Sequence, residues 1–244
     1  MSSYILNNRG TEDNIEYSTD DSDGDSDTQR EDPDMVDKYI LKELCAGGAF
    51  SSVYHGENVR TGMPVAIKTE PTDSEVGLLR HESRMYMRLR GAVGLFLPKW
   101  YGVSTRGLRC LVLPIGPPSL AAQSDALSDM HIGARIALSE RILGLLVDAL
   151  SDLHDRGVVH RDIKPANVLF DVDSNDPSCA LTIIDLGMAT WLPQTRRPTA
   201  LVGSPAFASF AAHACNPPAP VQDMESAAYT ALFVREGGEV PWNT

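Results

Sequence analysis

The polar residues between positions 160 and 185 could carry out phosphoryl transfer. Asp162 and Asn167 lie five positions apart in the run His-Arg-Asp-Ile-Lys-Pro-Ala-Asn, and Asp185 follows eighteen positions after Asn167. A carboxylate can accept the proton of an attacking hydroxyl group, and carboxylate and amide oxygens are ligands that suit Mg2+. We therefore expect Asp162 to act as the base, and Asn167 and Asp185 to hold the Mg2+ ions that bridge nucleotide phosphates.

Regular elements around this segment should position it. Residues 168–170 and 181–184 are expected to form a short β-hairpin that returns Asp185 to the loop carrying Asp162. Apolar residues recur at helical spacing over residues 133–155, and a further apolar helix is expected to begin near Gln222 and to continue through residue 234. The apolar stripe of the first helix is expected to serve packing alone.

A small-residue segment upstream could cover the phosphates of a nucleotide. Backbone N–H groups of a glycine-containing hairpin can approach phosphate oxygens closely, because small side chains leave room. The positions that carry glycine in such loops are occupied by Ala46, Gly48 and Ser51, so only the middle glycine is kept, and alone the pattern is more often a simple turn. The nucleotide contacts expected here are Ala46, Gly47, Gly48, Ala49, Phe50, Ser51 and Val53.

The segment Val-Ala-Ile-Lys ending at Lys68 strengthens that interpretation. Its alternation fits a strand, which would direct Lys68 toward the phosphates while Ala66 and Val53 cover the adenine. Lys68 needs an acidic partner to stay oriented, and the predicted helix over residues 75–89 offers Glu75 and Glu82. We expect Glu82, because it lies on the apolar face of that helix; a solvated surface charge is the alternative.

Together these motifs resemble those of protein kinases: the H-R-D-x-x-x-x-N loop, the glycine-rich loop and the V-A-I-K strand. The resemblance implies an α+β, bilobal protein-kinase fold with a β-rich N-lobe and a helical C-lobe, ATP and Mg2+ as cofactors, and protein substrates. Lys164 stands where serine/threonine kinases place a lysine that neutralises the transferring phosphoryl group. The resemblance also implies Leu113 as gatekeeper, Gly116 at the end of the hinge, Leu169 below the adenine, and Asp223 on the backbone of the catalytic loop.

Three further segments resemble the casein kinase 1 group, which also contains the vaccinia-related kinases. They are residues 81–86 (His-Glu-Ser-Arg-Met-Tyr), residues 116–120 (Gly-Pro-Pro-Ser-Leu) and residues 203–209 (Gly-Ser-Pro-Ala-Phe-Ala-Ser). In this group an arginine is expected at the position of Ala206, so the preference for acidic substrates is not carried over. Arg196 and Arg197 are either a substitute anion site or two solvated arginines.

The charge is concentrated at the N-terminus. Residues 1–37 contain twelve acidic residues against Arg9 and Arg30, a net charge of −10 out of the total of −12. So acidic and apolar-poor a segment is expected to be a disordered tail. We therefore expect three parts: a tail over residues 1–37, an N-lobe with hinge over residues 38–116, and a C-lobe over residues 117–244.

Composition also bears on partners and location. The net charge and the lack of a basic stripe disfavour nucleic-acid binding. Neither a run of eighteen apolar residues nor a signal peptide is present, so we expect no membrane insertion and a place in the cytoplasm or nucleus, of a host cell if the source is viral. The four scattered cysteines are expected to be reduced thiols.

The chain ends two residues after Pro-Trp, where kinases of the casein kinase 1 group continue through further helices. We therefore expect a C-lobe that lacks its last helices and exposes an apolar patch that could bind a partner; its residues would be Tyr229, Leu232, Phe233 and Trp242. Two functions follow: an active serine/threonine kinase, because every catalytic side chain is present, or a pseudokinase scaffold acting through protein contacts.

Overall fold

The computed structural model describes residues 34–47, 51–74, 77–172 and 180–242, which belong to the second of two compact units, residues 33–244. The expected acidic tail up to residue 33 and the expected phosphate contacts Gly48, Ala49 and Phe50 lie outside the described residues.

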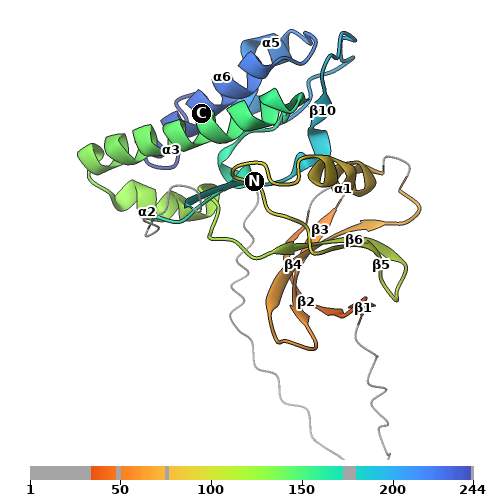
Figure 1. Ribbon diagram of the computed structural model, residues 1–244. Helices are drawn as coiled ribbons and strands as arrows, with labels where there is room; N and C mark the ends of the chain where they lie inside the picture. Colours follow the sequence, from red (N-terminus) through yellow and green to blue (C-terminus); the bar gives the residue numbers. More distant parts are fainter. Residues whose placement is uncertain (1–33, 48–50, 75–76, 173–179, 243–244) are drawn as a thin grey trace, which may run out of the picture. The chain divides into compact units, whose positions relative to one another are not determined.

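A six-stranded antiparallel sheet forms the N-terminal half of this unit, with strand order β1-β2-β3-β4-β6-β5 (Figure 1). Alternation along β4 separates its two faces: Val65 and Ile67 are fully buried in one apolar cluster, while Ala66 and Lys68 point to the other face. The strands are β1 (Met35–Val36), β2 (Tyr39–Gly47), β3 (Ser52–Asn58), β4 (Pro64–Pro71), β5 (Trp100–Val103) and β6 (Leu108–Pro114).

Helix α1 (Leu78–Arg88) packs against the second face of the sheet (Figure 1). Its buried residues include Leu79, Met85 and Tyr86, which share a cluster with Leu111 of β6. The helix was predicted to begin at residue 75 but begins at Leu78, because Gly77 has a left-handed backbone with φ of 59° and cannot continue a helix. The helical face chosen from the sequence is the buried one.

The C-terminal half is mainly helical. Helices α3 (Ile132–Asp155) and α6 (Pro220–Arg235) lie side by side and form its core through residues such as Ile142, Leu146 and Val234 (Figure 1). The expectation that Phe233 is exposed is wrong: it is 9% exposed and packs edge-on against Phe207, with ring centroids 6.2 Å apart. The shorter helices are α2 (Ser124–Asp129) and α5 (Phe210–His213).

Short paired segments complete the helical half. Strand β7 (Val158–Val159) pairs with β10 (Thr190–Trp191), and β8 (Val168–Phe170) pairs with β9 (Leu181–Ile183) as an antiparallel hairpin, one residue shorter than predicted. Single 3-10 turns are η1 (Ala121–Gln123), η2 (Pro165–Asn167), η3 (Leu186–Met188) and η4 (Pro205–Phe207). The two halves together are the α+β, bilobal architecture that the sequence predicted.

The N-terminal boundary differs from the predicted one. Residues 34–37 were assigned to the tail, but β1 pairs with β2 and Val36 is fully buried. Asp34 attaches the segment before β1 to the turn between β5 and β6. Its Oδ1 accepts a 3.0 Å hydrogen bond from the Thr105 hydroxyl. The ordered domain therefore includes residue 34.

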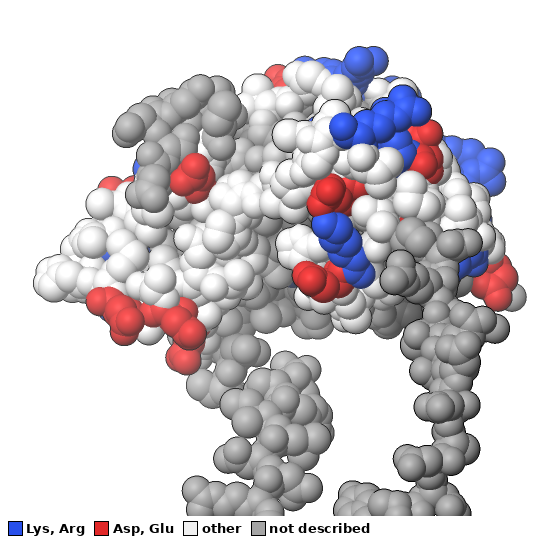
Figure 2. All heavy atoms as spheres, turned by 90° about the horizontal axis from the view of Figure 1, so that it is seen from below, with Lys and Arg blue, Asp and Glu red and all other residues white. Residues whose placement is uncertain are grey.

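No helix within the described ranges is long and apolar enough to cross a membrane. On the face shown in Figure 2, acidic and basic side chains are interspersed at the right, a separate group of acidic side chains lies at the lower left, and uncharged surface lies between them. Outside residues 1–37 the net charge of the sequence is −2.

Candidate active site

Lys68 joins three parts of the chain. Its position opposite Val53 in the β3–β4 ladder directs the side chain toward α1. The Nζ atom lies 2.8 Å from Oε2 of Glu82, the carboxylate that the sequence analysis pairs with it, and 2.7 Å from Oδ1 of Asp185. One ammonium group thus connects the sheet, the helix and the segment after β9.

Burial and charge oppose each other at these three groups. Burial raises the pKa of Glu82 to about 7, since the side chain is 1% exposed and Lys68 only partly offsets the loss of solvation. Burial alone would lower the pKa of Lys68, but the two carboxylates outweigh it and raise the value. Burial would likewise raise the pKa of Asp185, but Lys68 and the Gly187 N–H hold it below its usual range. The lysine and Asp185 are therefore charged at neutral pH, while Glu82 is poised to titrate.

Asp162 is oriented through both carboxylate oxygens. Oδ1 accepts a hydrogen bond of 2.8 Å from the Ser204 N–H, and Oδ2 accepts one of 3.1 Å from the Asn167 amide. The ammonium of Lys164 lies 2.9 Å from Oδ2 of Asp162 and donates to the Ser204 hydroxyl at 2.7 Å. The carboxylate, the ammonium and the hydroxyl form one connected group on the rim of the cleft.

Asp223 of α6 binds the backbone of the loop that carries Asp162. Its carboxylate, 1% exposed, accepts hydrogen bonds from the N–H groups of His160 at 2.7 Å and Arg161 at 2.8 Å. The His154 ring donates to the same carboxylate at 2.9 Å. These bonds fix Arg161 in a left-handed conformation with φ of 68°, which turns the chain toward Asp162. These contacts are the physical basis for the organising role that the resemblance implies for Asp223.

The polar groups line one cleft of about 280 Å³, bordered by Ser51, Lys68, Glu82, Asp162, Lys164 and Asp185. Asn167 adjoins this cleft through its bonds to Asp162. Among the described residues, Asn167 bonds through its amide nitrogen and Asp185 through Oδ1, which leaves Asn167 Oδ1 and Asp185 Oδ2 for a metal. Two free hard oxygens suit Mg2+, which takes one or two protein ligands together with phosphates and waters. The residues present therefore fit the metal.

The apolar end of the site is built by the hinge and the strands that precede it. Ala66 lies opposite Leu113 in the β4–β6 ladder, on the same face as Val53 and Lys68. A Cβ atom on Gly116 would lie 2.6 Å from Leu169 Cδ1 and 2.7 Å from the Phe96 ring, so a larger residue there would require these side chains to move. The residues that flank the expected glycine-rich loop are paired in the β2–β3 ladder, Ala46 with Val53 and Gly47 with Ser52. Of the expected adenine contacts, Val53, Ala66 and Leu113 thus share the face of the sheet that carries Lys68, and Gly116 lies against Leu169.

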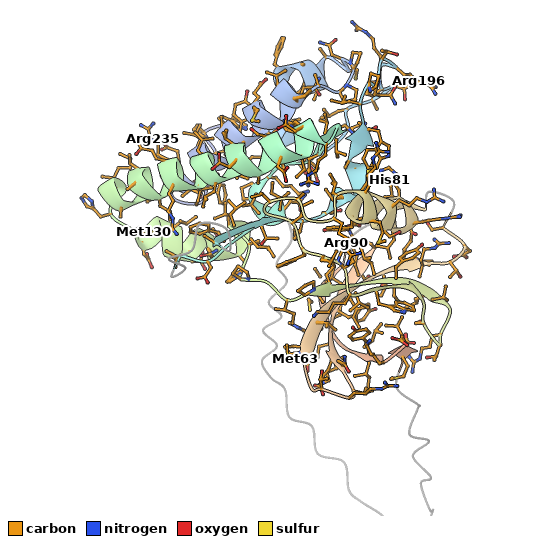
Figure 3. The ribbon with its side chains drawn as sticks, in the orientation of Figure 1. Met63, His81, Arg90, Met130, Arg196 and Arg235 are labelled. Carbon is orange, nitrogen blue, oxygen red and sulfur yellow. The ribbon has the colours of Figure 1, made fainter. Side chains whose placement is uncertain are left out.

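Sequence reasoning assigned no role to His81. Its ring Nε2 donates a 2.7 Å hydrogen bond to the carbonyl of Ala189, and Figure 3 shows the residue where α1 approaches β10. Arg161 Nε donates to the neighbouring carbonyl, that of Met188, at 2.6 Å. Adjacent carbonyls after Asp185 are therefore held by α1 and by the catalytic loop. The only sequence signal was the position of His81 next to Glu82.

Arg196 and Arg197 do not line the cleft that contains Lys68 and Asp162. Arg196 and Arg197 line a separate cavity of about 340 Å³ that also includes Arg161, and Figure 3 shows Arg196 in the loop beyond β10. Three arginines therefore line this one cavity.

Comparison with known families gives one finding. A family model described as the protein kinase domain matches residues 39–224, from the start of β2 into α6, which is well over half of the chain. Every predicted site residue from Ala46 to Asp185 falls within the matched interval, as does Asp223.

Proposed function

Because this chain belongs to the protein kinase family, we propose that it is an active serine/threonine protein kinase that uses ATP with Mg2+. The observation that carries the proposal is the convergence of Lys68, Asp162, Lys164 and Asp185 on one cleft. All four side chains are anchored by hydrogen bonds or ion pairs within the domain, as positioning for phosphoryl transfer requires.

In the proposed reaction, the oxygen of a substrate hydroxyl forms a bond to the γ-phosphorus of ATP. The bond from that phosphorus to the bridging oxygen breaks, ADP leaves, and the hydroxyl proton passes to Asp162. The Ser204 N–H and the Asn167 amide keep the carboxylate aimed, while Lys164 offsets negative charge that gathers on the transferring group.

Lys68 would donate to oxygens of the α- and β-phosphates, with Glu82 keeping its ammonium oriented. Asn167 and Asp185 would hold Mg2+, which supplies positive charge against the nucleotide phosphates. The strand residues Val53 and Ala66, with Leu169 opposite them, would enclose the adenine, and the backbone at Gly116 would hydrogen-bond its edge.

Specificity for serine and threonine is supported by Lys164. Its ammonium lies between the Asp162 carboxylate and the Ser204 hydroxyl, so positive charge stands beside the base. Placement in the casein kinase 1 group is supported by the Ala-Ser element at 208–209, where the Ser209 hydroxyl caps α5 by accepting from Ala212 N–H at 3.1 Å. Both assignments belong to the proposal.

The decisive experiment is transfer of radiolabelled γ-phosphate from Mg·ATP to casein and to the protein itself, followed by phosphoamino-acid analysis. Asp162→Asn should lower the rate about 10²- to 10⁴-fold, because it removes the base but preserves shape. Lys68→Met should abolish detectable transfer. Asp148→Asn, an exposed change on α3, is the matched control and should leave the rate unchanged.

The alternative is a pseudokinase that acts through protein contacts. It would be favoured if folded protein binds ATP, as measured by a thermal shift, yet transfers no phosphate under any metal condition. Label on tyrosine would instead reject the role given to Lys164, and transfer by Asp162→Asn at a rate close to that of the wild type would reject the assigned base.

A further inference from the structure

Glu70 is a buried carboxylate beside the candidate active site that the proposed reaction does not use. It follows Lys68 by two positions in β4, so both side chains point to the same face of the sheet, and it borders the cleft of about 280 Å³. Only 1% of the side chain is exposed. Burying a charge costs free energy unless the charge is paired and hydrogen-bonded. The partners of Glu70 therefore indicate its role.

Arg109 neutralises this carboxylate from the neighbouring strand. The two residues lie opposite each other in the β4–β6 ladder, and Nη1 of Arg109 donates a 2.7 Å hydrogen bond to Oε2 of Glu70. Nη2 of the same guanidinium donates to the carbonyl of Thr72 at 3.1 Å, in the connection from β4 to α1. The ion pair thus belongs to the sheet and also holds the first part of the chain that leads to the helix.

The other oxygen of Glu70 binds the beginning of α1. Oε1 accepts a hydrogen bond of 2.8 Å from the N–H of Leu78, the first residue of the helix, and one of 3.4 Å from the Ser74 hydroxyl. The first N–H groups of a helix have no acceptor within it, and negative charge is favourable at this end. Gly77, which precedes the helix, provides no side-chain cap. The cap therefore comes from Glu70, on the strand that carries Lys68.

We propose that Glu70 is a positioning residue for nucleotide binding, which sets the place of Glu82 relative to Lys68. The capped residue Leu78 precedes Glu82 by four positions, which is about 6 Å along the helix axis, or one turn. Strand β4 and this turn of α1 are therefore joined twice, at Glu70 with Leu78 and at Lys68 with Glu82. Loss of the first contact frees the helix to shift and weakens the second. The proposal rests on the proposed function and adds a residue to it.

A double-mutant cycle in the full chain provides the test. Glu70→Gln preserves the shape of the side chain but removes the charge that caps α1 and pairs with Arg109. With casein in excess, it should lower kcat/KM for ATP about fivefold, mainly by raising KM, because Lys68 is the proposed phosphate-binding group. In the Glu82→Gln background the contact that Glu70 positions is already weakened, so the same change should lower kcat/KM less than about twofold.

Glu57→Gln is the matched control, because Glu57 is ion-paired with Lys42 on the exposed part of the same sheet and does not line the cleft. It should leave kcat/KM for ATP unchanged, since exposed ion pairs contribute little. Combining Glu70→Gln with Arg109→Gln leaves no unpaired buried charge, and this variant replaces Glu70→Gln in the cycle if the single change unfolds the domain. Equal fold losses with and without Glu82→Gln, or a lower free energy of unfolding with no change in KM for ATP, would overturn the proposal.

A binding measurement separates this proposal from the proposed function. The Kd of the β,γ-imido analogue of ATP with Mg2+ is measured by calorimetry for the same variants. If Glu70→Gln raises Kd about fivefold in the wild type but less than about twofold in the Glu82→Gln background, while no variant transfers phosphate, the positioning role is supported and the kinase activity is rejected. Phosphate transfer by the wild type together with equal fold changes in the two backgrounds would support the kinase activity and reject the positioning role.

Discussion

The two halves of the cleft are held in different ways. In the helical half, Asp162 is oriented through both of its oxygens, and the loop that carries it is fixed by the buried carboxylate of Asp223. In the sheet half, Lys68 is oriented by Glu82, whose second oxygen, Oε1, is buried and has no hydrogen-bond partner among the described residues. The proposed base is thus preorganised by the core, whereas the position of Lys68, the proposed phosphate-binding lysine, depends on where α1 lies.

The largest expected effect tests the helical half of the cleft. Asp223→Ala should lower the free energy of unfolding by about 3 to 5 kcal/mol, because it leaves the His160 and Arg161 N–H groups buried without acceptors. Urea unfolding followed by circular dichroism measures the change, with exposed Asp148→Ala as control. A loss below about 1 kcal/mol, within the range for ordinary surface changes, would mean that the loop does not depend on this carboxylate.

Changes in the sheet half should lower kcat/KM more than they lower the free energy of unfolding. Glu82→Gln keeps the shape and an acceptor for Lys68 but removes the charge attraction, so kcat/KM should fall about 10- to 100-fold, which is roughly 1.4 to 2.7 kcal/mol. The free energy of unfolding should change little, because the lost ion pair is offset by the lost cost of burying a charge. Glu140→Gln on the exposed side of α3 is the control. Equal losses in stability and catalysis would remove the contrast between the halves.

The pH dependence sharpens the same contrast. The pKa of Glu82 is raised from its ordinary 4.5 to about 7, so the charged form that holds Lys68 appears as pH rises through 7. Because kcat/KM reports the free enzyme, it should rise up to tenfold between pH 6 and 8. Stability should move the other way: the folded state binds this proton more tightly, so the contribution of Glu82 to stability falls as pH rises from about 4.5 to 7.

Glu82→Gln provides the control for both slopes. The variant should flatten the rise in kcat/KM and the fall in the free energy of unfolding over that pH range. A rise in kcat/KM that persists in the variant would assign the titration to another group.

The smallest expected effect concerns His81. His81→Ala should lower kcat/KM about three- to tenfold, because it releases α1 from the Ala189 carbonyl but leaves the Lys68–Glu82 pair in place. His81→Gln, which can still donate to that carbonyl, should recover much of the loss, whereas simple loss of packing would not be rescued. Met87→Ala, on the exposed side of α1, is the control and should leave the rate unchanged.

The sequence predicted what is encoded locally. The spacing of Asp162, Asn167 and Asp185 implied a loop and hairpin, and these elements have nearly the predicted bounds. Helical periodicity placed Glu82 on the buried face of α1, where it meets Lys68. In these cases the relevant neighbours are close in sequence, or one face of an element has to be buried.

What the sequence did not predict depends on distant backbone atoms. The His81 acceptor is a carbonyl 108 positions away, and Asp34 binds a turn some 70 positions away, so neither side chain differs in type from an ordinary surface residue. Strand β1 has only two residues and follows an acidic stretch. Phe233 is buried because Phe207 returns to it from the segment before α5, a contact that periodicity within α6 cannot reveal.

The bonds to the Met188 and Ala189 carbonyls have a mechanical consequence. One carbonyl is tied to the catalytic loop through Arg161 and the next to α1 through His81, so a rotation of the two halves against each other twists the single residue between these peptide planes. Opening or closing of the cleft would therefore change the backbone dihedral angles of Ala189. The Thr190 N–H lies in the same peptide plane as the Ala189 carbonyl, so the NMR chemical shift of this amide would report the change.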